Sequence, residues 1–380
     1  MNMEIKNLKA INEVFKRLNN LRRWTEFSAE ARYDEISKQA LNCCICFILA
    51  VEAENRGVTI NWERFPKIAV YRAFQKAYVN YDTPEHILKE ICDLGDVAFE
   101  KAFGDVTYQT IAELTDEKFA DYLKDGCGTV EEKVYRGATK IATFLELKEF
   151  QRNINGEYAK KYQELIKSMV KYEEIPGFIE ISEPESEYFN VFHSISKLRN
   201  QNRWAAYSYL VDCSVLGHLF DTAVFAYIMA IEKGYTESMA TKCFFMGIFH
   251  DIPEAFTKDI PSPIKDKIPG FRELTERYEL CMMEQHVYPF VPEETAKALK
   301  DIMFEDVDNA EFKTLMKGAD YMSAVSEIWR QLKAGTRDDS FVDAISGHQQ
   351  KFQTGVAEIT PSTERLLHEI VTYAEKLDLQ

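Results

Sequence analysis

The sequence lacks any long apolar run without interruption. Its uninterrupted apolar runs, such as Cys43 to Val51, fall far short of the roughly 20 residues needed to cross a membrane. Residues 1–15 mix charged and apolar side chains and do not contain the apolar stretch of a signal peptide. We therefore expect a cytoplasmic protein without a membrane segment.

Positive charge is also scarce, with 46 Lys and Arg against 62 Asp and Glu, for a net charge of −16. A field of that sign repels nucleic acid, which argues against a DNA- or RNA-coating role. Small anionic substrates need only a local cationic pocket. The 380 residues, 46% hydrophobic and 28% charged, exclude a disordered or fibrous chain and leave room for two domains.

The chain has eight cysteines, but no second Cys pair or nearby His accompanies the cluster Cys43, Cys44 and Cys46. A redox pair or half of a zinc site at Cys43 and Cys46 is one interpretation. The absence of completing ligands favours the other, in which these are buried thiols of an apolar helix.

Strand-like alternation is nearly absent. The segment GFIEIS around Phe178 is the only fair candidate for a strand. Elsewhere apolar residues recur at helical spacing, which predicts helices over residues 214–234, 237–256 and 312–332. A last amphipathic helix, Ser362 to Leu377, is expected to pack on either domain or on another subunit. The fold class is predicted to be all-α.

Four short segments of the first half have counterparts about 180 residues later, in the same order. These pairs are RLNNLRRW (17–24) with KLRNQNRW (197–204), FILAVE (47–52) with YIMAIE (227–232), VYRAFQKAY (70–78) with IFHDIPEAF (248–256), and RGAT (136–139) with KGAD (317–320). We predict tandem helical domains over residues 1–171 and 188–380, joined by a linker over 172–187. The alternative is two amphipathic halves that share only a pattern.

Four potential metal ligands lie on three predicted helices of the second half: His218, the adjacent pair His250 and Asp251, and Asp320. Imidazole together with carboxylate suits a divalent ion such as Mn²⁺, Co²⁺, Mg²⁺ or Zn²⁺. Adjacent side chains on a helix diverge by about 100°, so both members of the His-Asp pair can ligate only near an irregular helix end. Taken alone, a His-Asp dipeptide is more typical of a capped helix end.

Two nearby residues strengthen the metal hypothesis. Pro253 disturbs the turn before it, which favours an irregular helix end at the His-Asp pair. Glu254 follows His250 by four residues and would share its helix face. It would thus place a carboxylate beside the metal, suited to a general acid or base.

The run FHDIPEAFTKDIPSPIKDKIPGF, with RW upstream of the first His and KGAD downstream, resembles the HD-domain phosphohydrolases. Within them it is most similar to the bacterial YfbR-like 5'-deoxynucleotidase family. The similarity covers most of residues 188–345, including KLRNQNRW, YPFVPEE and KGADYMSAV. Lys258 stands where a small residue is more usual in that family, which leaves the pocket shape open.

The resemblance implies a role for each matching position. The metal ligands would be His218, His250, Asp251 and Asp320. The catalytic carboxylate would be Glu254. The substrate-binding residues would be Arg203, Trp204, Asp259 and Glu305.

Each substrate-binding assignment has a structural alternative. Arg203 offers a planar fork for a phosphate dianion, or it ends a helix at the surface. Trp204 packs against the nucleoside, or it is a core tryptophan. Asp259 accepts a hydrogen bond from the sugar 3'-hydroxyl, or it caps a turn. Glu305 is a pocket residue, or it orients a ligating His.

Aligned with the second half, the first half has lost the ligands and the catalytic acid. The five positions are occupied by Lys38, Arg72, Ala73, Lys76 and Thr139. We predict a degenerate HD-like domain that is kept as a packing partner, so that the chain forms an internal pseudo-dimer. The alternative is that Lys38, Arg72 and Lys76 bind an anionic effector. Further homodimerisation is left open.

The predicted function is a metal-dependent phosphohydrolase acting on (deoxy)nucleoside 5'-monophosphates. A triphosphohydrolase or phosphodiesterase shares the same ligands, and extra basic residues such as Lys258, Lys265 and Lys267 would suit a triphosphate. A third alternative is a nucleotide sensor without turnover. The predicted partner is a small nucleotide, with no nucleic acid and no membrane.

Overall fold

The computed structural model describes residues 3–378 except 4, 29–30, 82, 84, 152–155, 259, 261 and 306–309. Within these residues it contains helices and turns and no strand, apart from two isolated bridges, so the all-α prediction is confirmed. The first half comprises α1 (Leu8–Asn20), α2 (Glu35–Asn55), α3 (Arg64–Phe74), η1 (Gln75–Asn80), α4 (Glu85–Leu94), α5 (Phe99–Leu114), α6 (Glu117–Lys124), α7 (Val130–Glu149), α8 (Gly156–Met169), η3 (Val170–Tyr172) and α9 (Phe178–Ser182).

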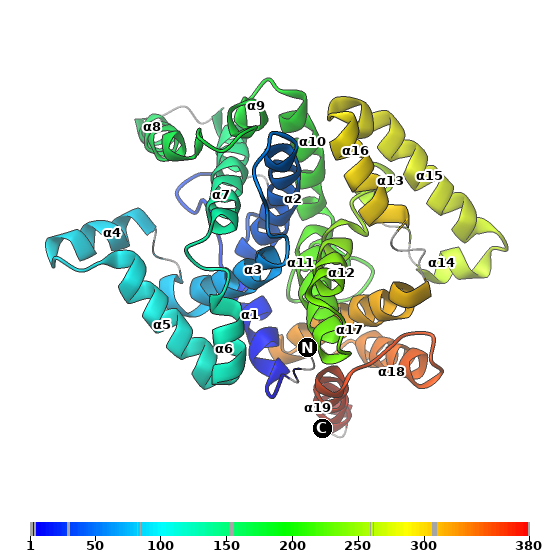
Figure 1. The fold of residues 1–380 in the computed structure, drawn as a ribbon. Coiled ribbons are helices and arrows are strands. Elements are labelled where there is room, and N and C mark those ends of the chain that lie inside the picture. The colour runs from blue at the N-terminus through cyan, green and yellow to red at the C-terminus, as the bar shows by residue number, and fades with distance from the viewer. Residues whose placement is uncertain are drawn as a thin grey trace.

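The second half is helical as well. It comprises α10 (Glu187–Ser196), η4 (Lys197–Asn200), α11 (Val215–Glu232), α12 (Glu237–Phe249), α13 (Glu254–Thr257), α14 (Ser262–Lys267), α15 (Phe271–His286), η5 (Tyr288–Phe290), α16 (Glu293–Lys300), η6 (Asp301–Glu305), α17 (Ala310–Ala334), α18 (Asp339–Gln353) and α19 (Pro361–Asp378). Figure 1 shows the first half, which runs from blue to green, beside the second half, which runs from green to red.

The centre of the protein is formed by α2 and α11, which pack against each other. Both helices are long and apolar enough to cross a membrane by length and composition alone. Their apolar windows are wholly buried inside the protein, as in the core helices of globular folds. Each is covered further by helices of its own half, α7 on α2 and both α12 and α17 on α11. The two core helices therefore also form the junction between the halves.

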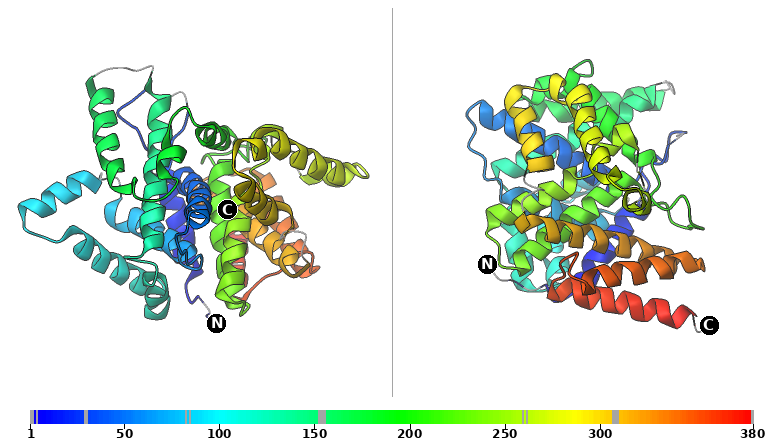
Figure 2. Two further views of the ribbon diagram at one scale, coloured as in Figure 1. Left: turned by 45° about the horizontal axis from the view of Figure 1, so that its top comes forward. Right: turned by 90° about the vertical axis from the view of Figure 1, so that its right-hand side faces the viewer.

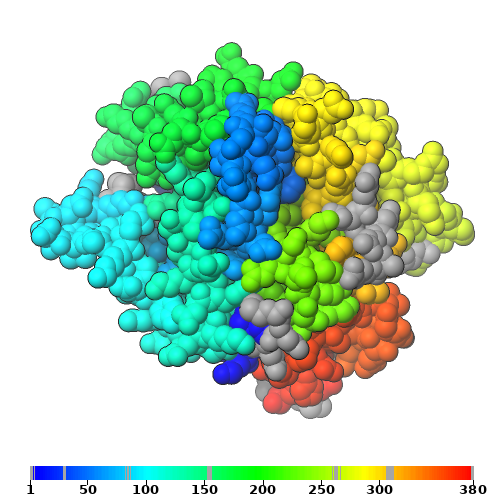
Figure 3. All heavy atoms as spheres, viewed as in Figure 1, coloured from blue at the N-terminus to red at the C-terminus, as the bar shows by residue number. Residues whose placement is uncertain are grey.

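Polar contacts cross this junction. The Ser37 and Ser214 hydroxyls, in the first turn of α2 and at the N-cap of α11, lie 2.8 Å apart. The ammonium of Lys67 on α3 lies 3.0 Å from the carboxylate of Glu237 at the start of α12. The space-filling view in Figure 3 and the rotated views in Figure 2 show the two halves packed directly against one another.

Two predicted elements are wrong in detail. GFIEIS is not a strand: Phe178–Ser182 is the short helix α9, which follows Gly177 in the left-handed region (φ 88°) and buries Phe178 and Ile181 on one face. The helix expected over 237–256 stops at Phe249, and a turn separates it from α13. The proline at residue 253, which lacks an N–H, accounts for the interruption.

The other predicted helices are confirmed as α11, α17 and α19. The cysteines Cys43, Cys44 and Cys46 are fully buried free thiols on α2. Burial raises the pKa of each of them well above its ordinary range. No metal-like cluster in the described part of the chain includes them. The interpretation as buried core thiols is therefore the one that the structure supports.

Candidate metal and phosphate site

The proposed ligands come from three helices that meet beside the core. His218 lies in the first turn of α11, which starts at the N-cap Ser214. His250 is the C-cap of α12, and Asp251 lies in the turn that follows. Gly247 allows α12 to approach α11 closely, since a Cβ atom there would lie 2.5 Å from the Cα of Ala223. This close approach brings the end of α12 beside the start of α11.

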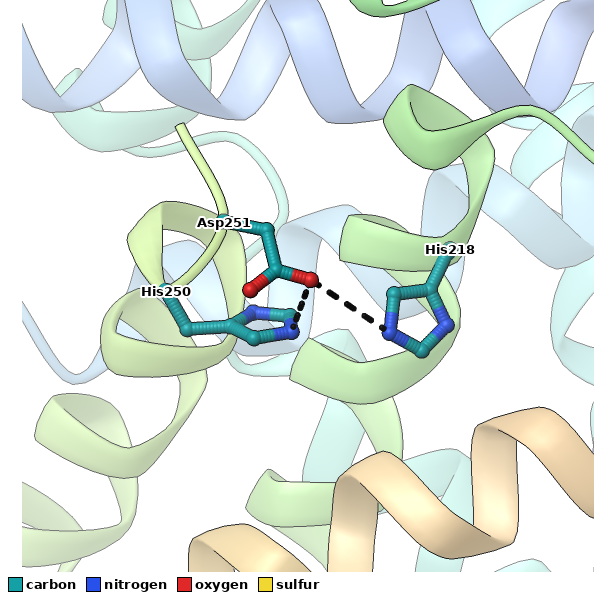
Figure 4. Close-up of side chains that lie close together, drawn as sticks. All are labelled: His218, His250 and Asp251. Carbon is teal, nitrogen blue, oxygen red and sulfur yellow. Dashed lines mark ion pairs between the residues drawn. The ribbon is translucent and has the colours of Figure 1, made fainter. Parts of the chain in front are cut away.

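Three of the ligand atoms converge, as Figure 4 shows. His218, His250 and Asp251 each offer a donor atom within 4.8 Å of the others. Oδ2 of Asp251 lies 3.1 Å from Nε2 of His250 and 4.0 Å from Nε2 of His218. Asp320, on α17, places Oδ1 3.0 Å from Nε2 of His218. All four predicted metal-binding side chains therefore lie in one cluster.

The orientation of the two imidazoles suits a cation. Nδ1 of His250 lies 2.8 Å from the carbonyl oxygen of Gly247, to which it donates in the tautomer that leaves Nε2 with a lone pair. That buried Nε2 makes no hydrogen bond of good geometry among the described residues, although it lies 3.1 Å from Oδ2 of Asp251. Nδ1 of His218 lies 2.8 Å from the hydroxyl of Ser323, so its Nε2 faces the carboxylates. Two imidazole nitrogens aimed at two carboxylates form a donor set that fits a divalent ion.

Electrostatics in the cluster show that opposite charges gather there. Burial and the nearby Arg203 lower the pKa of the His218 imidazole, but hydrogen bonds with Asp320 and Glu327 raise it overall to about 9. Burial alone raises the pKa of the Asp251 carboxyl, yet His250 and His218 lower it to about 2. These carboxylates thus stay ionised at neutral pH. A divalent ion bound between them would displace the proton from His218.

A buried carboxylate that the sequence prediction missed contacts Arg203, Trp204 and the proposed metal cluster. Glu327 on α17 is 1% exposed, and its Oε2 lies 3.2 Å from Nε of Arg203 and accepts a 2.9 Å hydrogen bond from Nε1 of Trp204. Its other oxygen lies 3.5 Å from Nδ1 of His218. Glu327 therefore links the arginine to a proposed metal ligand. Its position two turns after Asp320 on the same helix was the available sequence signal.

The remaining predicted residues are placed less completely. Trp204 is 7% exposed, with its ring against Tyr207 and Phe341, so it is largely a core residue that holds the Arg203 loop. Asp259 lies outside the described residues. Glu305 ends the π-helix η6, and its side chain is not described.

Glu254 opens α13 and is 6% exposed. Its backbone N–H donates a 3.1 Å hydrogen bond to the carbonyl of Asp251, and its own carbonyl accepts from the side chain of Gln201. It therefore lies one turn beyond a proposed metal ligand and is tied to the segment that carries Arg203. Because α12 ends at Phe249, Glu254 does not share a continuous helix with His250, contrary to the prediction.

The first half repeats the contacts that Glu327 makes with Arg203 and Trp204 in the second half. Glu146 on α7 lies 3.1 Å from Nε of Arg23 and accepts a 2.9 Å hydrogen bond from Nε1 of Trp24. The backbone agrees as well, because Arg23 N donates to Tyr33 O just as Arg203 N donates to Cys213 O. Isolated bridges join Arg22 with Asp34 and Asn202 with Ser214. The arrangement of arginine, tryptophan and glutamate thus occurs in both halves.

The all-α fold thus brings His218, the pair His250 and Asp251, and Asp320 together from three helices. Residues 190–374 match the family model of the YfbR-like 5'-deoxynucleotidases. The chain is 25% identical over 196 residues to a 5'-deoxynucleotidase of Photobacterium profundum, covering 51% of this chain and 96% of that protein. It is 26% identical over 150 residues to a 5'-deoxynucleotidase of Yersinia pestis, covering 39% of this chain and 76% of that protein. The predicted resemblance of the C-terminal half to this family is confirmed.

Proposed function

We propose that the protein is a metal-dependent phosphohydrolase that releases phosphate from deoxynucleoside 5'-monophosphates. The observation that carries this proposal is the connection between two sites. His218, in the proposed metal cluster, and Arg203, the proposed phosphate ligand, both contact the carboxylate of Glu327. A cation bound by the cluster would thereby lie next to the proposed phosphate-binding guanidinium of Arg203. The names of the relatives support a nucleotide substrate.

Each residue has a proposed task. The metal would be held by His218, His250, Asp251 and Asp320. When bound, a divalent ion supplies Lewis-acid polarisation of a phosphoryl oxygen. The guanidinium of Arg203, held by Glu327, orients the phosphate and balances the charge on its oxygens. Glu254 takes a proton from the attacking water or passes one to the leaving 5'-oxygen of the nucleoside. Trp204 keeps the Arg203 loop in place.

Phosphate release from a nucleotide panel tests this function. Protein stripped with EDTA and reloaded with Mn²⁺, Co²⁺, Mg²⁺ or Zn²⁺ would be assayed on deoxy- and ribonucleoside mono- and triphosphates. We expect metal-dependent orthophosphate from deoxymonophosphates. Tripolyphosphate from triphosphates alone would assign the site to a triphosphohydrolase instead. Nucleotide binding without any product would leave a sensor. Lys265 does not favour the triphosphate alternative, since it lies 3.7 Å from Glu279.

We also propose that the first half is a degenerate copy of the catalytic domain, with residues 172–187 as the connection. The recurrence of the arginine, tryptophan and glutamate arrangement supports this proposal. The core helices α2 and α11 pack together, which fits an internal pseudo-dimer within one chain. Cytoplasmic localisation and further homodimerisation stay predictions.

A further inference from the structure

The first half contains a cavity of about 630 Å³, lined by residues of α2, α3, η1 and α7 and of the loop that carries Arg23. Its wall includes Arg23, Trp24 and Lys38, together with Arg72 from the end of α3 and Lys76 from η1. In the sequence alignment of the halves, Lys38, Arg72 and Lys76 occupy the positions of His218, His250 and Glu254. The volume lies in the range of pockets that hold drug-sized or cofactor-sized ligands.

The wall of this cavity is cationic in a protein whose net charge is −16. Eight Lys and Arg residues line it, against four Glu residues. The buried arginine side chains are paired: Arg23 contacts Glu35 and Glu146, and Arg72 contacts Glu132. The excess positive charge therefore resides mainly on lysines.

Three of these lysines, Lys38, Lys76 and Lys140, have weak ion pairing. Only a 3.9 Å approach of Lys38 to Glu35 is found among the residues that the structure describes, and neither Lys76 nor Lys140 has an ion pair within 4 Å there. Lys38 is 7% exposed. Burial, followed by the nearby Arg23, lowers the pKa of its ammonium to about 8. Burial also lowers the pKa of Lys140. Buried cations crowded in this way cost stability, and a bound anion would remove that cost.

We propose that this cavity binds a nucleoside phosphate, with the phosphate group between Lys38 and Lys76. These two cationic side chains, from α2 and η1, supply charge-assisted hydrogen bonds to phosphate oxygens. Trp24, Tyr135 and Tyr172 also line the cavity and offer aromatic surface to a base or sugar. This proposal rests on the cavity itself and does not require the second half to be an enzyme.

The bound nucleotide is not hydrolysed at this site. Where the second half has four proposed metal ligands and a carboxylate, the first half has three cations, Ala73 and Thr139. The hydroxyl of Thr139 donates a hydrogen bond to the carbonyl of Tyr135 within α7. A group of lysines and an arginine repels a divalent ion. The cavity therefore combines anion binding with the absence of the chemistry proposed for the other half.

Isothermal titration calorimetry of the full chain in EDTA would test this binding. The probes are a deoxynucleoside monophosphate, the same nucleoside without phosphate, and inorganic phosphate. In an Arg203→Gln background, which removes the proposed phosphate ligand of the second half, we expect one nucleotide site per chain. Lys38→Met and Lys76→Met should each weaken it about tenfold or more. The matched control is Lys160→Met, because Lys160 is an exposed lysine on α8 paired with Glu164.

Thermal unfolding separates a binding role from a structural one. If Lys38 is a binding residue that the ligand-free fold tolerates at a cost, Lys38→Met should raise the melting temperature and reduce the increase caused by nucleotide. If Lys38 serves only as a partner of Glu35, the variant should melt earlier, and the proposal would be wrong.

The calorimetric titrations can also contradict the proposal. Unchanged nucleotide affinity in both lysine variants, or no site at all in the Arg203→Gln background, would also overturn the proposal. Inorganic phosphate binding as tightly as the nucleotide would overturn the nucleoside part of it. Phosphate release by the second half, measured separately on the Lys38→Met chain, is expected to be unchanged. Failure of that activity in the wild type would therefore not affect the binding result.

Discussion

The two halves share one framework of buried side chains and differ in the residues that lie around it. In each, a buried glutamate binds an arginine and the indole of the following tryptophan. Beyond it, the second half gathers His218, His250 and Asp320, whereas the first half gathers Lys38, Arg72 and Lys76. The framework can persist because its buried hydrogen bonds stabilise the fold in either case. The residues around the framework can therefore differ between the halves, and the chemistry of each site differs with them.

The largest effect should follow from removing a ligand of the proposed metal site. Asp320→Ala leaves His218 without its nearest carboxylate, 3.0 Å away, so we expect both bound metal and phosphate release to be lost. Metal analysis by mass spectrometry, together with the phosphate assay, would measure this. Lys317→Ala, an exposed position one turn earlier on α17, is the control. Full metal content and activity in Asp320→Ala would refute the ligand set.

Glu254→Gln separates proton transfer from metal binding. The amide keeps the shape of the side chain but cannot accept the proton, so kcat should fall roughly 10²- to 10⁴-fold while metal content stays the same. Steady-state kinetics and metal analysis of the same preparation would measure both. Glu273→Gln, at an exposed site on α15, is the matched control. Unchanged kcat would remove Glu254 from the proposed mechanism.

The third prediction compares the two equivalent glutamates. Glu327→Gln removes the negative charge that holds Arg203 and approaches His218, so kcat/KM should fall roughly 10- to 100-fold, with weaker metal binding. Glu146→Gln makes the same change at Arg23 and should leave kcat/KM unaltered. Equal kinetic losses in both variants would show that the framework acts only through stability.

Glu146→Gln should instead reduce the stability of the fold. Glu146 is fully buried and contacts two arginines, Arg23 and Arg199, so the neutral amide leaves positive charge poorly balanced. We expect a loss of about 1–3 kcal/mol in the free energy of unfolding. Urea denaturation would measure it, with Glu157→Gln, an exposed position on α8, as the control. A variant as stable as the wild type would contradict this prediction.

The smallest effect is the pH dependence of Lys38. Its pKa is about 8 in the folded protein, below the ordinary value of 10.5. Between these values the unfolded chain holds a proton that the folded chain has released, so stability rises with pH across this window. Lys38→Met should therefore be more stable than the wild type by roughly 1–3 kcal/mol at pH 7.

The difference in unfolding free energy between Lys38→Met and the wild type should shrink from pH 8 upwards and disappear above pH 10.5, where Lys38 is deprotonated in both the folded and the unfolded wild-type chain. Denaturation at pH 7, 8, 9 and 10 in the absence of nucleotide would follow it. A constant difference over this range would show that Lys38 does not titrate in the window. Lys160→Met provides the control for loss of an exposed lysine charge.

Most of the proposed site could be predicted from the sequence because its residue types are chemically unusual in a helical core. His218 is one example, since a histidine in a strongly apolar helix needs a polar partner. His250 and Asp251 can both ligate a metal only where their helix ends, and Pro253 predicted that end. Glu327 was missed because a glutamate in an amphipathic helix is ordinary in sequence. Only its burial beside Arg203 and Trp204 distinguishes it.

The sequence alone determined the helical fold class, because the period of its apolar residues is a local property of the chain. It also determined the set of proposed ligands and the lack of such residues at the aligned positions of the first half. The tertiary structure decided that α12 stops at Phe249, that GFIEIS is a helix and that Glu327 joins Arg203 to His218. It also decided that Lys38 is buried among other cations. These features depend on contacts between residues far apart in the chain, which no local pattern records.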